Sequence, residues 1–203
     1  MSKSNKPEVF SDQLERWLKG KNNTTVASLI DAFEEKSFAI VFVLLMLLPA
    51  LPIPTGGVPH VLEIIVVIVA FEMIIGLKTI WLPGWARRLK LGDSIKGKAI
   101  PLLLKRVRWF EERSRPHGVA VFDATITDRF IGLLVIVFTA AAFAAPPFTG
   151  LDTLPSLGVV IIGLAIIFED IRLLFAGAIT GIAGVTLTIT LGAAVFEGVQ
   201  RIL

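Results

Sequence analysis

Three ionisable side chains interrupt an otherwise apolar stretch of the sequence, and they are the groups best placed to do chemistry. His60, Glu63 and Glu72 lie between Val58 and Leu77. A carboxylate inside a membrane segment is costly, so it is by default a candidate for binding a ligand or carrying a proton. On a helix His60 and Glu63 share a face, whereas Glu63 and Glu72 lie on opposite faces. The alternative is structural, with Glu63 near a turn in headgroups or water and Glu72 near the cytoplasmic end of its helix.

Proline, threonine and glycine form the second set of candidates, because they interrupt two apolar segments at matching places. Pro-x-x-Thr-Gly occurs in the first apex (residues 48–59) and again in the second apex (residues 144–155), at a constant offset of 94. A broken helix frees backbone groups that protein, water or a ligand must satisfy. Matched breaks in an internal repeat are the best sequence indication of a transporter's site. The alternative is that both apexes are surface turns, which need no function.

The helices that begin after Gly57 and at Thr153 point their positive N-terminal ends toward the two apexes, with Thr153 as a capping residue. Such ends attract anions, so apexes that meet inside a membrane would hold a lipid phosphate or a small anion. Arg129 and Arg172 either assist there or snorkel to the interface. The candidate binding residues are therefore Pro52, Pro54, Thr55, Gly56, Gly57, His60, Glu63, Glu72, Arg129, Pro146, Thr149, Gly150, Thr153 and Glu169.

The sequence contains none of the usual enzyme signatures. It has no nucleophile elbow, P-loop or dinucleotide fingerprint. There is no cysteine and there are only 2 histidines among the 203 residues, so ligands for a metal are scarce. We therefore expect a protein that is not an enzyme and that uses no metal or cofactor.

Long uncharged segments of the sequence indicate which helices position the candidate site residues. Of the residues, 54% are hydrophobic, and no charge occurs in 37–59, 130–151 or 173–196. Residues 38–51 supply only ~21 Å of helix, which is short of a ~30 Å bilayer core. The sequence therefore predicts an all-α integral membrane protein. Two related helical hairpins, re-entrant or fully crossing, are followed by a C-terminal transmembrane helix and accompanied by interfacial amphipathic helices.

We divide this single membrane domain into five parts. These are an amphipathic N-terminal region (1–36), the first hairpin (37–77), a basic interfacial linker (78–127), the second hairpin (128–170) and the C-terminal helix (171–203). Residues 1–36 are polar and contain no secretory signal, so the first apolar segment is expected to be retained. The apolar residues of 10–18 predict a helix that lies either at the interface or on the protein's own surface. So few short helices bury little surface, and we expect a homodimer.

The linker is strongly basic. Residues 78–115 contain eleven lysines and arginines against three acids. Between membrane segments this favours a cytoplasmic loop on anionic lipid over a nucleic-acid site. We therefore expect the N-terminus and the linker to be cytoplasmic, with Trp81 and Trp85 at the membrane surface.

The order of several motifs resembles the ExoD family of bacterial inner-membrane proteins. The resemblance covers about residues 10–196 and rests on Glu35-Lys36-Ser37-Phe38, both apexes, Trp81-Leu82-Pro83 with Arg87-Arg88, Asp128 to Leu134, and Phe168-Glu169-Asp170. Members of that family often carry an amide at Glu72 and an arginine at Lys78. The resemblance implies a location in the bacterial inner membrane and a link to exopolysaccharide production, without a catalytic motif.

Three functions are compatible with these observations. The first is a small transporter or lipid-handling protein that supports exopolysaccharide production or export. The second is a membrane scaffold for a polysaccharide machinery. The third is an ion or proton pathway through Glu63 and Glu72.

Overall fold

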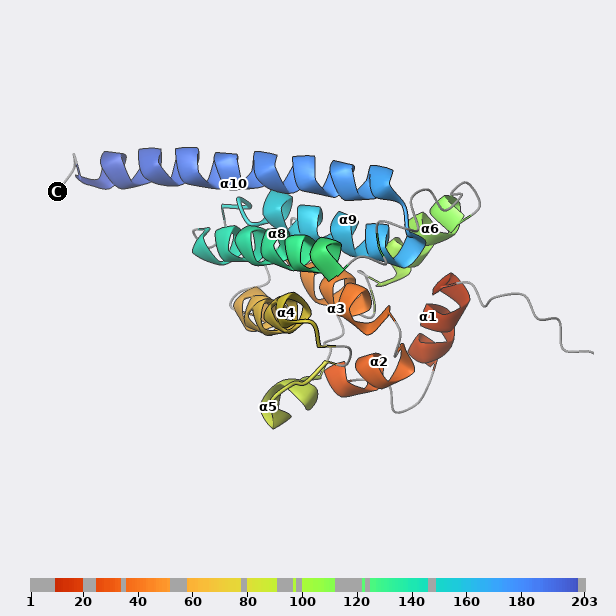
Figure 1. Cartoon of the computed structure of the whole chain (residues 1–203). Helices are drawn as coiled ribbons and strands as arrows, with labels where there is room; N and C mark the ends of the chain where they lie inside the picture. Colours follow the sequence, from red (N-terminus) through yellow and green to blue (C-terminus); the bar gives the residue numbers. More distant parts are fainter. Residues whose placement is uncertain are drawn as a thin grey trace, which may run out of the picture.

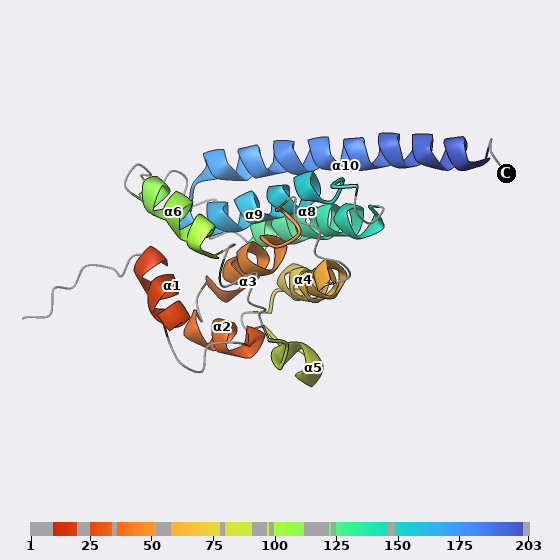
Figure 2. The same ribbon diagram turned by 180° about the vertical axis from the view of Figure 1, so that it is seen from behind.

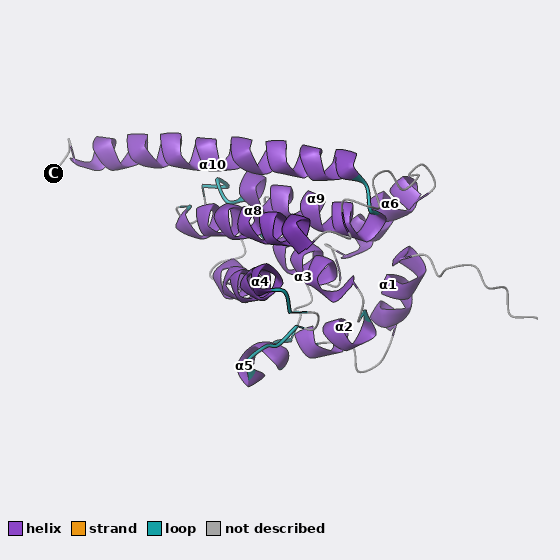
Figure 3. Ribbon diagram, viewed as in Figure 1, coloured by secondary structure: helices purple, strands orange, loops and turns teal. Residues whose placement is uncertain are grey.

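The fold is helical throughout the residues that the structure describes (Figure 3). The computed structural model describes residues 10–19, 25–33, 36–51, 58–77, 80–90, 97, 100–111, 122, 125–145 and 149–200. Within these ranges there is no strand, only an isolated antiparallel bridge between Thr25 and Lys90. The predicted all-α class is therefore confirmed.

Two helical hairpins and one long helix form the body of the molecule (Figure 1). The first hairpin consists of α3 (Ser37–Met46) and α4 (Val58–Ile75), the second of α8 (Thr125–Ala144) and α9 (Thr153–Phe168), and α10 (Ile171–Gln200) follows. Among the described residues, two helices, over Ile126–Ala144 and Ile171–Leu191, are long and apolar enough to cross a membrane. With 10 residues, α3 extends only ~15 Å, about half of a bilayer core.

The short helix α3 lies at the centre of this body. Every residue of α3 except Phe38 is buried, because α4, α9 and α2 (Val26–Ala32) pack around it. A helix that is apolar on all sides is typical of a core position. No side chain of α3 is charged, so its burial requires no charge to leave water.

Both hairpins open toward the same end of the molecule. α4 and α8 are antiparallel, because the His60 ring contacts Phe143 while Gly132 approaches Ala70. α3 and α9 are also antiparallel, since Lys36 at the start of α3 donates through Nζ to the carbonyl oxygen of Ile167 at 2.7 Å. The start of the first hairpin therefore lies beside the end of the second, and the two apex ends lie together at the opposite side.

Glycines bring α10 against α9. A Cβ added to Gly158 would lie 2.6 Å from Cα of Gly181, and one added to Gly184 would lie 2.5 Å from the backbone nitrogen of Pro155. Small residues allow helix backbones to approach this closely. α9 is thus held between α3 on one side and α10 on the other.

Four short helices accompany this body in the part of the chain that the structure describes: α1 (Phe10–Lys19), α2, α5 (Gly84–Arg87) and α6 (Ile100–Glu111). α1 and α6 lie at the end of the body where α9 passes into α10, as the views from both sides show (Figures 1 and 2). Leu14 and Trp17 of α1 are buried, and the Trp17 indole donates to the carbonyl oxygen of Ser28 at 3.1 Å. Ile100 and Val107 of α6 are buried as well. Of the two alternatives for the N-terminal helix, the structure favours packing on the protein's own surface.

Candidate functional site

The most deeply buried acid in the described residues is Glu63, near the start of α4. Its side chain is 1% exposed. One carboxylate oxygen, Oε2, lies 2.9 Å from Nδ1 of His60, so the predicted sharing of a helix face is confirmed. The other oxygen, Oε1, is buried and has no hydrogen-bond partner among the described residues. A buried acceptor without a donor is unfavourable, which makes this oxygen a position where a ligand or water would be stabilised.

The second hairpin contributes to the surroundings of this pair. The His60 ring meets Phe143 of α8 edge to face, with centroids 4.9 Å apart. The charge of Asp152, at the second apex, acts on both His60 and Glu63. The two apex ends are therefore close enough to form one polar site in a largely apolar bundle. Among the described residues no group of three histidine and acidic side chains is arranged to hold a metal ion.

The second apex is built as a turn. Gly150 has φ +71°, a conformation that favours glycine, and its carbonyl oxygen accepts from the Thr153 backbone N–H at 3.2 Å. The Thr149 hydroxyl accepts from the Leu151 backbone N–H at 3.4 Å. Thr149 and Gly150 are both exposed. Thr153 is the first residue of α9 and not its cap, which is Asp152, so the predicted capping role of Thr153 is wrong.

Six predicted site residues lie outside the described residues: Pro52, Pro54, Thr55, Gly56, Gly57 and Pro146.

Glu72 serves a different purpose from Glu63. It is buried near the end of α4 and accepts the Trp81 backbone N–H through Oε2 at 2.8 Å. It thereby fastens the segment after α4 back onto that helix. An amide oxygen can accept the same bond, which explains how an amide at this position would fit the same fold.

Arg129 and Glu169 lie at the open end of the hairpins, away from the apexes. Arg129 is exposed in the first turns of α8, and 15 residues of helix put it ~22 Å from the end of that helix. Glu169 binds Lys36 at 3.1 Å between carboxylate oxygen and Nζ. Of the two alternatives for Arg129 and Arg172, the structure favours a position at the opposite end of the bundle from the apexes, because Arg129 lies in the first turns of α8 and Arg172 in the first turn of α10.

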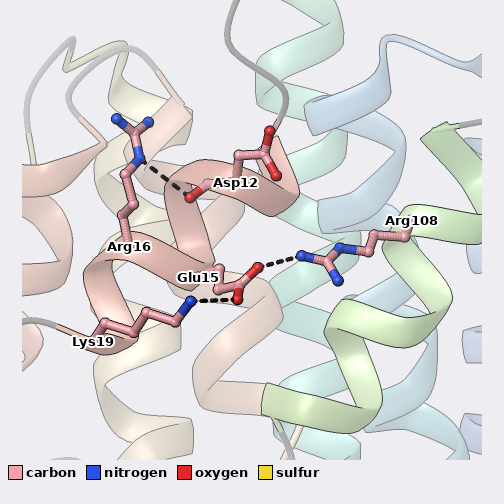
Figure 4. Close-up of polar contacts among 5 residues, drawn as sticks. All are labelled: Asp12, Glu15, Arg16, Lys19 and Arg108. Atoms are coloured by element: carbon pink, nitrogen blue, oxygen red, sulfur yellow. Dashed lines mark hydrogen bonds and ion pairs between the residues drawn. The ribbon is translucent and has the colours of Figure 1, made fainter.

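Sequence reasoning missed a groove between α1 and α6, where Glu15 contacts Lys19 and Arg108 (Figure 4). It has a volume of about 640 Å³ and is lined by Glu15, Leu18, Lys19, Pro101, Leu104, Lys105 and Arg108. Glu15 is one of the lining residues and forms ion pairs with Lys19, at 2.7 Å between Oε1 and Nζ, and with Arg108 of α6. The hydrogen bond and charge of Lys19, and then the charge of Arg108, lower the pKa of Glu15. The two helices are more than eighty residues apart in the chain, and no local pattern signals their contact.

Comparison with known proteins identifies the family. The family model described as "Exopolysaccharide synthesis, ExoD" matches residues 10–190, which is most of the chain. The chain belongs to the ExoD family. The resemblance inferred from the motifs is thus confirmed, and ExoD membership implies a role in exopolysaccharide synthesis.

One relative of this ExoD protein is the "Uncharacterized protein slr1875" of Synechocystis sp. It is 29% identical over 170 residues, which cover 82% of this chain and 74% of the relative. No solved structure matches the chain.

Proposed function

We propose that this ExoD protein is a small membrane transporter or lipid-handling protein, and that it acts on a saccharide-bearing lipid of exopolysaccharide production. The observation that carries the proposal is the Glu63 carboxylate, which is buried at the meeting of the two apex ends with one oxygen paired to His60 and the other unpartnered among the described residues. Sugar hydroxyls are hydrogen-bond donors, and a carboxylate oxygen is the acceptor that orients them. The apex end is the polar site of the proposed transporter.

The distribution of apolar surface supports a location in the bacterial inner membrane. Only 33% of the apolar window of α8 and 22% of that of α10 are buried inside the protein. Large apolar side chains of both helices face outward, among them Ile126 at 80% exposure and Ile179 at 68%. A continuous apolar surface of this kind is stable against lipid and unstable against water. We propose that the open end with the N-terminal region and the basic 78–127 linker is cytoplasmic, and that two copies of the chain pair.

Two close helix crossings support the internal repeat. A Cβ on Gly132 of α8 would lie 2.9 Å from the Ala70 oxygen of α4, and a Cβ on Gly163 of α9 would lie 2.9 Å from the Ala39 oxygen of α3. The residues correspond between hairpins at an offset of 93, because 132 − 39 = 93 and 163 − 70 = 93, which is one residue less than the offset of 94 between the apex motifs. Both hairpins also open at the same end. We therefore infer a parallel repeat, with a pseudo-twofold axis running along the hairpins and the proposed site at its apex end.

Reconstitution tests this function. The purified chain is incorporated into liposomes that contain a radiolabelled mannosyl polyprenyl phosphate, and concanavalin A added outside captures the sugar on the outer leaflet. Protein-free vesicles expose about half of the label. If the chain moves the lipid across the bilayer, nearly all of the label becomes accessible within minutes. Accessibility that stays at the protein-free level refutes the transport proposal and leaves the scaffold function as the alternative.

A pair of matched variants locates the activity. Glu63→Gln keeps the shape of the side chain but removes the charge beside His60, and we expect it to slow lipid movement at least tenfold, because charged hydrogen bonds are worth ~1.5–3 kcal/mol. Glu72→Gln makes the same chemical change on the same helix, yet it retains an acceptor for the Trp81 N–H and should leave the rate unchanged. Equal rates of lipid movement for both variants would show that Glu63 is not part of the site.

A proton pathway through both acids is the weaker candidate. Glu63 and Glu72 lie near opposite ends of α4 and have separate partners, His60 for one and the Trp81 backbone for the other. A relay between them would require donors along about 13 Å of apolar helix.

A further inference from the structure

The groove between α1 and α6 combines positive charge with an apolar lining. Its charged side chains are Lys19, Lys105, Arg108 and Glu15, which sum to 3 − 1 = +2. Glu15 is already bound by Lys19 and Arg108. Lys105 is exposed and makes no ion pair among the described residues, so its ammonium group is available to a ligand.

The rest of the lining is apolar. Leu18 of α1 and Pro101 and Leu104 of α6 complete the groove. Leu18 and Leu104 pack against the buried core of the protein, so this part of the wall is fixed in place. A ligand that satisfies the whole groove therefore has an anionic part for the cations and an apolar part for the leucines. Its volume of about 640 Å³ is in the range of sites that hold small organic molecules.

The position of the groove indicates which amphipathic anion is available. α1 and α6 lie beside the turn from α9 to α10 (Figures 1 and 2). The apolar window of α10 begins at Ile171, directly after that turn, and Phe175 in the next turn is exposed. If α10 spans a bilayer, this level corresponds to the headgroup zone. Basic pockets at that level on the cytoplasmic side are suited to anionic lipid headgroups.

We propose that the α1–α6 groove binds the phosphate-bearing headgroup of an anionic phospholipid. Lys105 and Arg108 contact the phosphate, while Leu18 and Leu104 contact the start of the acyl chains. The bound lipid joins α1 to α6 and so fixes the N-terminal region on the body. This site lies at the opposite end from Glu63 and does not depend on the proposed transport function.

Native mass spectrometry of the full chain in detergent tests the site. The protein is titrated with phosphatidylglycerol and, separately, with phosphatidylcholine of the same chain length. Phosphatidylglycerol is expected to bind at least fivefold more tightly, because each lysine or arginine near an anionic headgroup contributes appreciably. Equal affinities for the two lipids would overturn the proposal.

Two charge reversals separate a built site from general attraction. Lys105→Glu should weaken phosphatidylglycerol binding about five- to thirtyfold, as one favourable contact becomes a repulsive one. Lys90→Glu, an exposed lysine outside the groove, should change it less than twofold. Equal losses of phosphatidylglycerol affinity in both variants would mean that the lipid is attracted only by the net charge of the protein. Displacement of the lipid by millimolar inorganic phosphate alone would show a free-phosphate site and refute the lipid assignment.

Discussion

Replacing Gly158 by alanine should weaken the packing of α9 on α10 by about 2 kcal/mol. The new Cβ would lie 2.6 Å from Cα and 2.7 Å from the backbone nitrogen of Gly181. Neither atom can rotate away, so the two helices must move apart by about 1 Å to restore an ordinary contact of 3.4–4 Å. Overpacking of this kind costs ~1–3 kcal/mol, with a rigid backbone contact near the upper limit. The higher helix propensity of alanine stabilises the variant by up to ~1 kcal/mol. The expected net loss of stability is therefore about 2 kcal/mol.

Thermal unfolding of the purified protein in detergent measures this loss. A change of about 2 kcal/mol corresponds to a fall in Tm of roughly 4–8 °C for a chain of this size. Gly84→Ala is the matched control, because a Cβ at that exposed position meets nothing within 4 Å. If Gly158→Ala unfolds at or above the temperature of the control, the close approach of α9 and α10 is not a determinant of stability and the reasoning fails.

Two further predictions concern hydrogen bonds and pH. Thr188→Val should lower the free energy of unfolding by ~1–2 kcal/mol, because the buried hydroxyl shares its proton between the Leu151 oxygen at 3.2 Å and the Gly184 oxygen of its own helix at 3.0 Å, and valine removes the bond to Leu151. Thr190→Val, whose exposed hydroxyl bonds only its own helix, should change it by less than about 0.5 kcal/mol, and denaturant titration compares the two variants. The pKa of Glu15 is lowered in the folded protein. The ion pairs of Glu15 therefore hold α1 on α6 fully above the ordinary glutamate pKa of about 4.3, and this stabilisation is lost as pH falls through the lower pKa of the folded state. Spin labels on single cysteines introduced into α1 and α6 should therefore move apart below pH 4 in the parent but not in Glu15→Gln, and a constant distance in the parent would contradict this.

Much of the architecture follows from local sequence, because proline and uncharged runs act locally. The first prolines after the two uncharged runs begin, Pro49 and Pro146, follow closely on the ends of α3 at Met46 and of α8 at Ala144, because proline does not fit a helix interior. Residues 52–57 of the first apex lie outside the described residues, and re-entry into a bilayer stays a prediction. The sequence pattern of the N-terminal helix does not predict whether its apolar face packs on lipid or on protein, because an amphipathic face fits both equally well.

The candidate site could be predicted only in part, for a related reason. Spacing along one helix predicts the His60–Glu63 pair, and the structure confirms it. The approach of Asp152 depends on how one hairpin packs on the other, which no spacing within a helix encodes. The sequence left two positions open for Arg129, at the apexes or at the interface. The length of α8 decides between them, because it puts ~22 Å between Arg129 and the apex end of that helix.

The length of α10 gives the molecule an asymmetric outline. The second apex reaches only to Thr188, where that hydroxyl meets Leu151, and α10 continues to Gln200, ~18 Å further at 1.5 Å per residue. From Ile171 to Thr188 the helix rises ~26 Å, so with the open end at one surface the hairpins would reach across most of a ~30 Å bilayer core. The last turns of α10 would then pass the apexes and continue as a single helix into the far headgroup zone. Lipids beside the slightly shorter hairpins would adjust to them by a small local thinning of the far leaflet, and this thinning lowers the distance over which a polar headgroup has to travel.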